Sequence, residues 1–190
     1  MKLEQLRACA LPITWTTLRV GWDHGLLPTE ELQHYAADHL GKHSGEKGEW
    51  IFLLFDADPT DRRQIRQYLE ALAENETSDS ERSQEVAKRT WNVASLLDCL
   101  ATYYPDDAVP AADEPYALDS AITDLVALCQ IAPFRNLCTP PWDRLTVISE
   151  MYGPNSRPFA EIYTDVLSQT RRWLVEEADR IRQDALNLPP

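Results

Sequence analysis

Apolar side chains three and four residues apart dominate the long segments of this sequence, and clusters of proline separate those segments. The clearest case follows Pro158, where apolar residues continue at helical spacing as far as Ile181. Such spacing places apolar side chains on one face of an α-helix, whereas proline cannot continue a helix. The sequence therefore predicts an all-α fold, organised as a single domain over residues 1–190, with six or seven helices and proline-rich connections.

The expected helices cover 15–22, 29–43, 59–72, 85–103, 116–130 and 158–181. Thr29 is expected to cap the second of them, and Asp58 is expected to cap the helix that starts at Pro59. The run 50–55 is apolar on every side, so it fits a buried helix turn or a short buried strand. Helix is favoured there, with a short strand pair as the alternative. Residues 145–151 are ambiguous.

The four cysteines lack a C-x-x-C pairing and fall mostly within apolar helical patterns, where a free thiol behaves as a small hydrophobe. They are Cys9, Cys99, Cys129 and Cys138. The first ten residues mix apolar with charged side chains, and no later stretch reaches the roughly 18 apolar residues of a membrane span. These features predict a cytoplasmic protein with reduced thiols and no membrane association.

Negative charge is concentrated in one part of the chain, which has a formal net charge of -13. The stretch 90–134 contains no Lys, Arg or His, and its acids are Asp98, Asp106, Asp107, Asp113, Glu114, Asp119 and Asp124. Such a block steers cationic partners and repels nucleic acid and anionic lipid. We therefore expect a basic protein partner and no binding to nucleic acid.

Tyr103 and Tyr104 precede Pro105 and two of these acids, a composition common on binding surfaces. We expect the tyrosines to belong to the core, whereas the acids either contact a partner or are simply solvated. The candidate partner-binding residues are Tyr104, Asp106, Asp107, Asp113 and Glu114, extended along the next helix by Asp119 and Asp124. The last two need not share a helix face, because a spacing of five is off the helical repeat.

Catalytic and metal-binding patterns are weak. His39 and His43 have the spacing of two ligands on a helix, but no third ligand accompanies them. Asp56 and Asp58 follow an apolar run, as carboxylates that hold Mg²⁺ do in some phosphoryl-transfer enzymes, although helix capping explains Asp58 as well. G-x-S-x-G and P-loop motifs are absent from the sequence. We therefore expect no enzyme activity, no cofactor and no metal site.

Two motifs carry a family resemblance. The first is Ile13-Thr14-Trp15-x-x-Leu18-x-x-Gly21-Trp22-x-x-Gly25-Leu26-Leu27, and the second is the Tyr-Pro-acid segment that starts at Tyr103. They resemble a bacterial family known as domain of unknown function 2247, whose genes lie beside polymorphic toxin genes. The resemblance covers about the first two thirds of the chain. It implies an immunity protein of contact-dependent growth inhibition, that is, a cytoplasmic inhibitor of a delivered toxin.

The expected function is therefore binding and neutralisation of a cognate toxin domain, in a 1:1 complex with a basic partner such as a nuclease. The protein itself is expected to be a monomer or a weak dimer. The alternative is a cytoplasmic helical adaptor or regulator that binds another basic protein. A third hypothesis, an Mg²⁺ enzyme using Asp56 and Asp58, predicts stabilisation by the metal.

Overall fold

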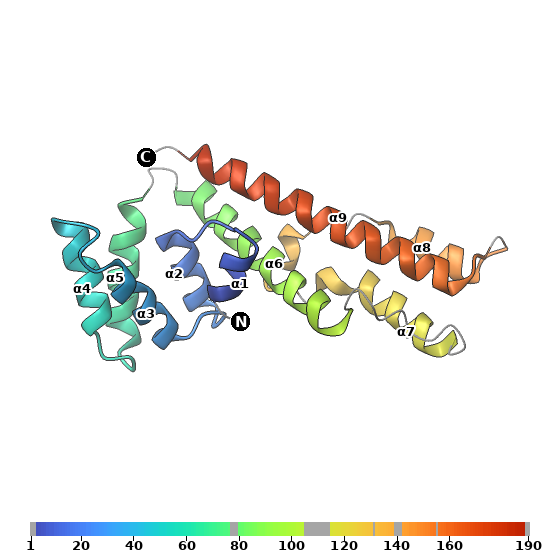
Figure 1. Ribbon diagram of the computed structural model, residues 1–190, viewed down its shortest axis with the longest axis horizontal. Helices are drawn as coiled ribbons and strands as arrows, with labels where there is room; N and C mark the ends of the chain where they lie inside the picture. The colour runs from blue at the N-terminus through green and yellow to red at the C-terminus, as the bar shows by residue number, and fades with distance from the viewer. Residues whose placement is uncertain are drawn as a thin grey trace. The chain divides into compact units, whose positions relative to one another are not determined.

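The computed structural model describes residues 3–76, 80–104, 115–130, 132–138, 142–154 and 156–188. Every regular element in these ranges is helical, so the all-α prediction is confirmed (Figure 1). The elements are α1 (Leu3–Ala8), α2 (Trp15–Asp23), α3 (Thr29–His39), α4 (Glu46–Asp56), α5 (Arg62–Glu74), α6 (Ser80–Tyr103), α7 (Pro115–Val126), η1 (Leu128–Gln130), η2 (Arg135–Leu137), α8 (Arg144–Tyr152) and α9 (Phe159–Leu186).

The described part of the chain holds nine α-helices, more than the six or seven expected, and the same residues form no strand. The run 50–55 belongs to α4, and the ambiguous segment 145–151 belongs to α8. Helix α1 has only six residues, too few to display a helical period in the sequence. None of the described helices is both long and apolar enough to cross a membrane.

The chain groups into two compact units, which we describe separately. Unit 1 comprises Met1–Trp91 and Arg180–Pro190, and unit 2 comprises Asn92–Asp179. The division falls within α6 and α9, so both long helices contribute residues to both units. The single domain over residues 1–190 stays a prediction.

Helix α2 supplies much of the core of unit 1, where it packs against α5 and α3. Trp15 and Trp22 of this helix are buried, and Trp91 of α6 is fully enclosed. The indole Nε1 of Trp91 donates to the Thr17 carbonyl oxygen at 2.8 Å. Trp22 donates to the Thr29 hydroxyl at 3.0 Å. Thr29 is thus the first residue of α3 and accepts from Trp22, and the prediction that it caps α3 is wrong.

The start of α5 also differs from the prediction. The helix begins at Arg62 rather than Pro59, and Asp61 caps it by accepting from a backbone N–H of the first turn. Asp58 instead closes the preceding turn, where it accepts from the Thr60 backbone N–H at 2.8 Å and from the Thr60 hydroxyl at 2.7 Å. These hydrogen bonds lower the pKa of Asp58. The carboxylate is therefore engaged in local turn structure.

The end of α1 is fixed by its own backbone and by α9. Ala10 adopts a φ of 49°, and the Leu11 N–H donates to the Leu6 carbonyl oxygen at 3.0 Å. This is the arrangement of a Schellman motif, in which a left-handed residue follows the helix. Arg182 donates to the carbonyl oxygens of Ala10 at 3.1 Å and Cys9 at 3.2 Å. The turn after α1 is thereby tied to the part of α9 that belongs to unit 1.

Glu76, just beyond α5, stabilises the start of α2. Its Oε2 accepts from the Thr16 backbone N–H at 3.1 Å, at a helix terminus where N–H groups have no intrahelical partner. A carboxylate in this position also interacts favourably with the helix dipole. Burial nevertheless raises the pKa of Glu76, and the backbone hydrogen bonds from Trp15 and Thr16 only partly offset that effect.

We expect Glu76→Gln to change the pH dependence of stability. Because the folded-state pKa of Glu76 lies above its ordinary value of 4.5, the native state binds more protons in this window than the unfolded state does. The unfolding free energy of the wild type therefore falls as pH rises from 4.5 through the raised pKa. Gln keeps an acceptor oxygen but does not titrate.

Urea unfolding at a series of pH values between about 4 and 8 measures this effect. The stability of Glu76→Gln relative to wild type should increase with pH and then level off. Glu74→Gln, which removes an exposed acid from α5, is the matched control. A Glu76→Gln difference that stays constant with pH contradicts the burial of this carboxyl.

Unit 2 is built from the later residues of α6 with α7, α8 and most of α9. Its apolar core includes Val93, Leu96, Leu100, Leu118, Ile122, Leu125, Met151, Ile162, Tyr163 and Val166. Buried Asn92 binds the backbone of Phe134 at two points: it accepts from the N–H and donates to the carbonyl oxygen, both at 2.8 Å. The side chain thus binds both backbone groups of Phe134, whose carbonyl oxygen also accepts from the Leu137 N–H of η2 at 2.9 Å.

The prediction of four reduced thiols is wrong for two of them. Cys129 and Cys138 form a disulfide, with their Cα atoms 5.7 Å apart, whereas Cys9 and Cys99 are free. The two paired cysteines are nine positions apart in sequence, and a spacing rule for short motifs does not detect such a pair. Cys129 lies in η1 and Cys138 directly follows η2, in the segment where Asn92 binds Phe134.

Candidate functional site

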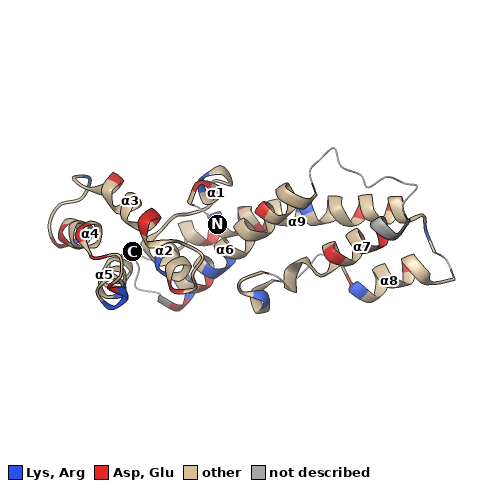
Figure 2. Ribbon diagram, turned by 90° about the horizontal axis from the view of Figure 1, so that it is seen from below, with Lys and Arg blue, Asp and Glu red and all other residues tan. Residues whose placement is uncertain are grey.

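The residues predicted to bind a partner fall into two groups. Asp106, Asp107, Asp113 and Glu114 lie outside the described residues. Tyr104, Asp119 and Asp124 lie in unit 2. Acidic residues also occur on helices of both units (Figure 2).

A groove of about 580 Å³ brings two of these predicted residues together within unit 2. One wall comes from the end of α6, and the other comes from α7 and the turn that follows it. The lining residues are Cys99, Tyr103, Tyr104, Ser120, Ala121, Asp124, Ala127 and Leu128. The lining is largely apolar, with two aromatic rings and one carboxylate, a composition suited to the contact region of a protein partner.

The two adjacent tyrosines differ in environment. Tyr104 is buried, and Arg171 donates to its carbonyl oxygen at 2.7 Å. Burial raises the pKa of Tyr104 to about 12, with smaller contributions from Asp124, Cys99 and Tyr163. Tyr103, in contrast, is 72% exposed. The expectation that both tyrosines belong to the core is thus confirmed for Tyr104 and wrong for Tyr103, which is free to contact a partner.

Asp119 and Asp124 point to different surroundings, as their spacing of five allows. Asp124 lines the same groove as Tyr103, is exposed, and forms no hydrogen bond or ion pair with the described residues. Asp119 accepts a hydrogen bond from the Tyr152 hydroxyl of α8. The groove therefore includes Asp124 but not Asp119.

The groove offers binding groups rather than a reactive nucleophile. Burial raises the pKa of the Cys99 thiol, and the neighbouring Asp98 raises it further. Cys99 and Tyr104 both stay protonated at neutral pH, whereas a nucleophilic cysteine needs a lowered pKa. The carboxylate of Asp124 can instead accept hydrogen bonds from an Arg or Lys side chain.

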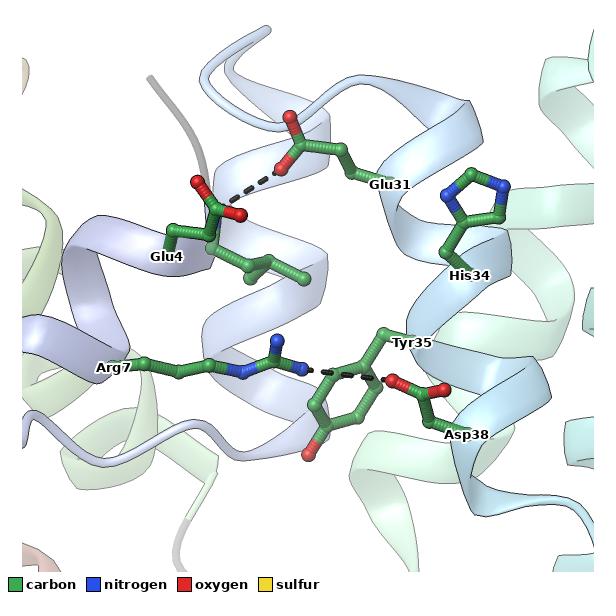
Figure 3. Close-up of a pocket in the computed structure, with 7 residues that line it drawn as sticks. Glu4, Arg7, Glu31, His34, Tyr35 and Asp38 are labelled. Atoms are coloured by element: carbon green, nitrogen blue, oxygen red, sulfur yellow. Dashed lines mark hydrogen bonds and ion pairs between the residues drawn. The ribbon is translucent and has the colours of Figure 1, made fainter.

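A second cleft, of about 230 Å³, lies between α1 and α3 in unit 1 (Figure 3). Its lining residues are Leu3, Glu4, Arg7, Glu31, His34, Tyr35 and Asp38. Glu31 accepts from the Leu3 backbone N–H at 3.0 Å, and the guanidinium of Arg7 lies 3.8 Å from Asp38. These contacts join α1 to α3. Both side chains of the Arg7–Asp38 ion pair are exposed to solvent, so the contribution of this pair to stability is small.

His39 contacts the preceding turn of its own helix. Its Nδ1 lies 2.8 Å from the Tyr35 carbonyl oxygen of the preceding turn, and its ring stacks on the Tyr35 ring at 4.1 Å. The His43 ring is parallel to it at 6.5 Å. Among the described residues, no three His, Cys, Asp or Glu side chains gather in a way that could hold a metal ion.

Sequence reasoning did not assign Cys99, Ser120, Ala121 or Leu128 to the site. All four are small or apolar residues that fit any helical pattern, so nothing local distinguishes a groove wall from a core position. The exposed Tyr103 was recognisable from the sequence, because an aromatic residue shortly before a proline and two acids is typical of binding surfaces.

Comparison with known families assigns the chain to one family. A family described as an uncharacterized protein conserved in bacteria, DUF2247, matches residues 3–116. The chain belongs to the DUF2247 family. No curated protein and no solved structure matches the chain. The DUF2247 match covers α1 to α6, and therefore the whole α1–α3 cleft but only the α6 wall of the groove.

Proposed function

We propose that this protein is an immunity protein that acts in the cytoplasm by binding a cognate basic toxin domain in a 1:1 complex. The observation that carries the proposal is that exposed Tyr103 and the carboxylate of Asp124 line the same α6–α7 groove. Tyrosine supplies a large contact area at low cost in conformational entropy. An adjacent carboxylate that has no ion-pair partner among the described residues can bind a cationic side chain of the toxin.

Charge supports the same proposal. The net charge of -13 favours rapid encounter with a cationic partner, and Asp106 and Asp107 follow Tyr104 and Pro105 directly in the sequence. A nuclease active site is one such cationic surface, since it must bind phosphates, and carboxylates can occupy it in their place. The proposed inhibition is stoichiometric binding, and it requires no chemical step by this protein.

The test begins with capture of partners by the purified protein from a lysate of its own bacterium. The captured domain is then expressed alone and together with this protein. Support requires that the domain stops growth when expressed alone, that co-expression restores growth, and that the complex is 1:1. A captured basic protein that is not toxic would favour an adaptor instead.

Site variants connect this result to the groove. We expect Tyr103→Ala to weaken toxin binding by about tenfold or more, and Asp124→Asn to slow association mainly at low salt. Two substitutions at exposed residues of unit 1 are the controls: Phe52→Ala also removes an aromatic ring, and Glu70→Gln also neutralises a carboxylate. Both should leave binding unchanged. Biolayer interferometry with the captured domain at two salt concentrations measures both rates. Full affinity in both groove variants would exclude the groove as the binding site.

A further inference from the structure

Helix α8 carries an apolar surface that nothing in the described structure covers. Leu145 is 74% exposed, Ile148 is 40% exposed and Tyr152 is 63% exposed. Their spacing of three and four places them on one face of the helix, next to the face that carries the buried Val147 and Met151. A soluble protein rarely exposes a continuous apolar stripe without a use for it.

A groove of about 450 Å³ lies beside the stripe at Leu145. It is lined by Asp143, Leu145, Thr146, Ser149, Glu150 and Pro154. The exposed face of α8 therefore combines protruding apolar side chains with a hollow beside them. This combination fits the ridges of a second helix, whose side chains recur at the same three- and four-residue spacing.

Tyr152 is held in place at one end of the stripe. Its hydroxyl donates to Asp119 of α7, and its ring contacts the Phe159 ring edge to face, with the centroids 5.9 Å apart. A side chain that is already ordered loses little conformational entropy when a partner binds, so Tyr152 is suited to act as an anchor.

Carboxylates lie at both ends of the stripe. Asp119 accepts from the Tyr152 hydroxyl at one end. At the other end Asp143 caps α8, next to Leu145, by accepting from the Thr146 backbone N–H and hydroxyl.

The other charges near the stripe are mostly negative. Glu150 lines the groove, but Arg157 binds it at 3.1 Å and also binds Asp165 at 2.5 Å. Arg157 is also 3.8 Å from Glu161, so this one guanidinium forms ion pairs with three carboxylates. Arg144 is the one base on α8. The surroundings of the stripe are therefore net negative.

We propose that the α8 stripe (Leu145, Ile148 and Tyr152, with Asp119) is a docking surface for a basic amphipathic helix of another protein. Apolar side chains of that helix would cover the stripe, and its Lys or Arg residues would pair with Asp119 and Asp143. The inference does not depend on the proposed function, because different residues carry it. The family match ends at residue 116, so α8 lies outside the part of the chain that the DUF2247 match covers.

The probe is a fluorescein-labelled synthetic helical peptide of about 18 residues, long enough to form a helix. It carries Leu on one face and Lys on both flanks, and a second peptide has Glu in place of every Lys. Fluorescence anisotropy with the full chain should show binding of the Lys peptide and at least tenfold weaker binding of the Glu peptide. The double variant Leu145→Ser/Ile148→Ser should bind the Lys peptide at least tenfold more weakly than wild type.

Two further variants make the test specific. Asp119→Asn should weaken binding by about threefold at low salt and reduce its salt dependence. Val175→Ser removes an exposed apolar residue of α9 in the same unit and should leave binding unchanged. Circular dichroism melting checks that every variant is folded.

Three results would overturn the proposal. The first is no binding of the Lys peptide to the wild type, and the second is equal binding of the two peptides, which would mean nonspecific apolar contact. The third is a dimer of the wild type in sedimentation experiments that Leu145→Ser/Ile148→Ser abolishes, because a second copy would then cover the stripe.

Discussion

Gly21→Ala should destabilise unit 1 by about 3 kcal/mol, at the upper end of the range for overpacked cores. A Cβ atom at Gly21 would lie 2.2 Å from Cζ2 and 2.4 Å from Cε2 of Trp91. The Trp91 ring cannot move away easily, because it is fully buried and its Nε1 is hydrogen-bonded to the Thr17 carbonyl oxygen. Helix α2 must therefore shift as a whole or the indole must leave its site.

Urea unfolding of Gly21→Ala measures this loss, and Gly25→Ala is the matched control. Gly25 has a φ of +69° but open space around its Cα, so alanine there should cost only about 1 kcal/mol of backbone strain. The double variant Gly21→Ala/Trp91→Phe should lose less stability than the sum of the single variants, since phenylalanine lacks the part of the ring that clashes. Equal stability of wild type and Gly21→Ala would refute this close approach.

Asn92→Ala should destabilise unit 2 by about 2 kcal/mol, because it removes a buried side chain that hydrogen-bonds to both backbone groups of Phe134. The side chain of Asn92 is the acceptor for the Phe134 N–H and the donor to the Phe134 carbonyl oxygen, each at 2.8 Å. Asn92→Asp keeps the acceptor but loses the donor and adds a buried charge, so it should also be destabilising.

Hydrogen exchange followed by NMR locates this effect. The Phe134 amide should exchange faster in Asn92→Ala, by a factor larger than the change in global stability requires. Asn75→Ala, which removes an exposed side chain that donates to the Ala71 carbonyl oxygen, should cost a few tenths of a kcal/mol and leave the Phe134 amide unchanged. Unchanged exchange at Phe134 in Asn92→Ala would contradict the two-point contact.

The local pattern of apolar residues was sufficient to predict the helices that have a strong apolar face. In α5 the predicted inner residues are all buried: Ile65, Tyr68, Leu69 and Leu72. The helical period of 3.6 residues places them on one face, and this period can be recognised within a short stretch of sequence. Helix ends were less predictable. The cap of α5 is Asp61 rather than Asp58, and both are acids in a turn-forming sequence, so only the observed hydrogen bonds distinguish them.

The candidate site was partly predictable. Tyr104 and Asp124 were expected and do line the groove, whereas Asp119 faces Tyr152 of α8. The partner of Asp119 lies 33 residues further along the chain. The spacing of residues within α7 cannot predict a contact with a residue so far away in the sequence. The exposure of Tyr103 next to buried Tyr104 likewise depends on where α7 and α9 pack.

The sequence by itself therefore determined the all-α class, the inner faces of the strongest helices and the concentration of acids in 90–134, because each is a property of neighbouring residues. The tertiary structure alone decided the Cys129–Cys138 pairing, the contact between Gly21 and Trp91, the binding of Phe134 by Asn92 and the exposed stripe on α8. The Gly21–Trp91 and Asn92–Phe134 contacts join segments far apart in the chain. The disulfide and the exposed stripe lie within short segments, but how the chain folds around them is set by the packing of whole helices rather than by local preference.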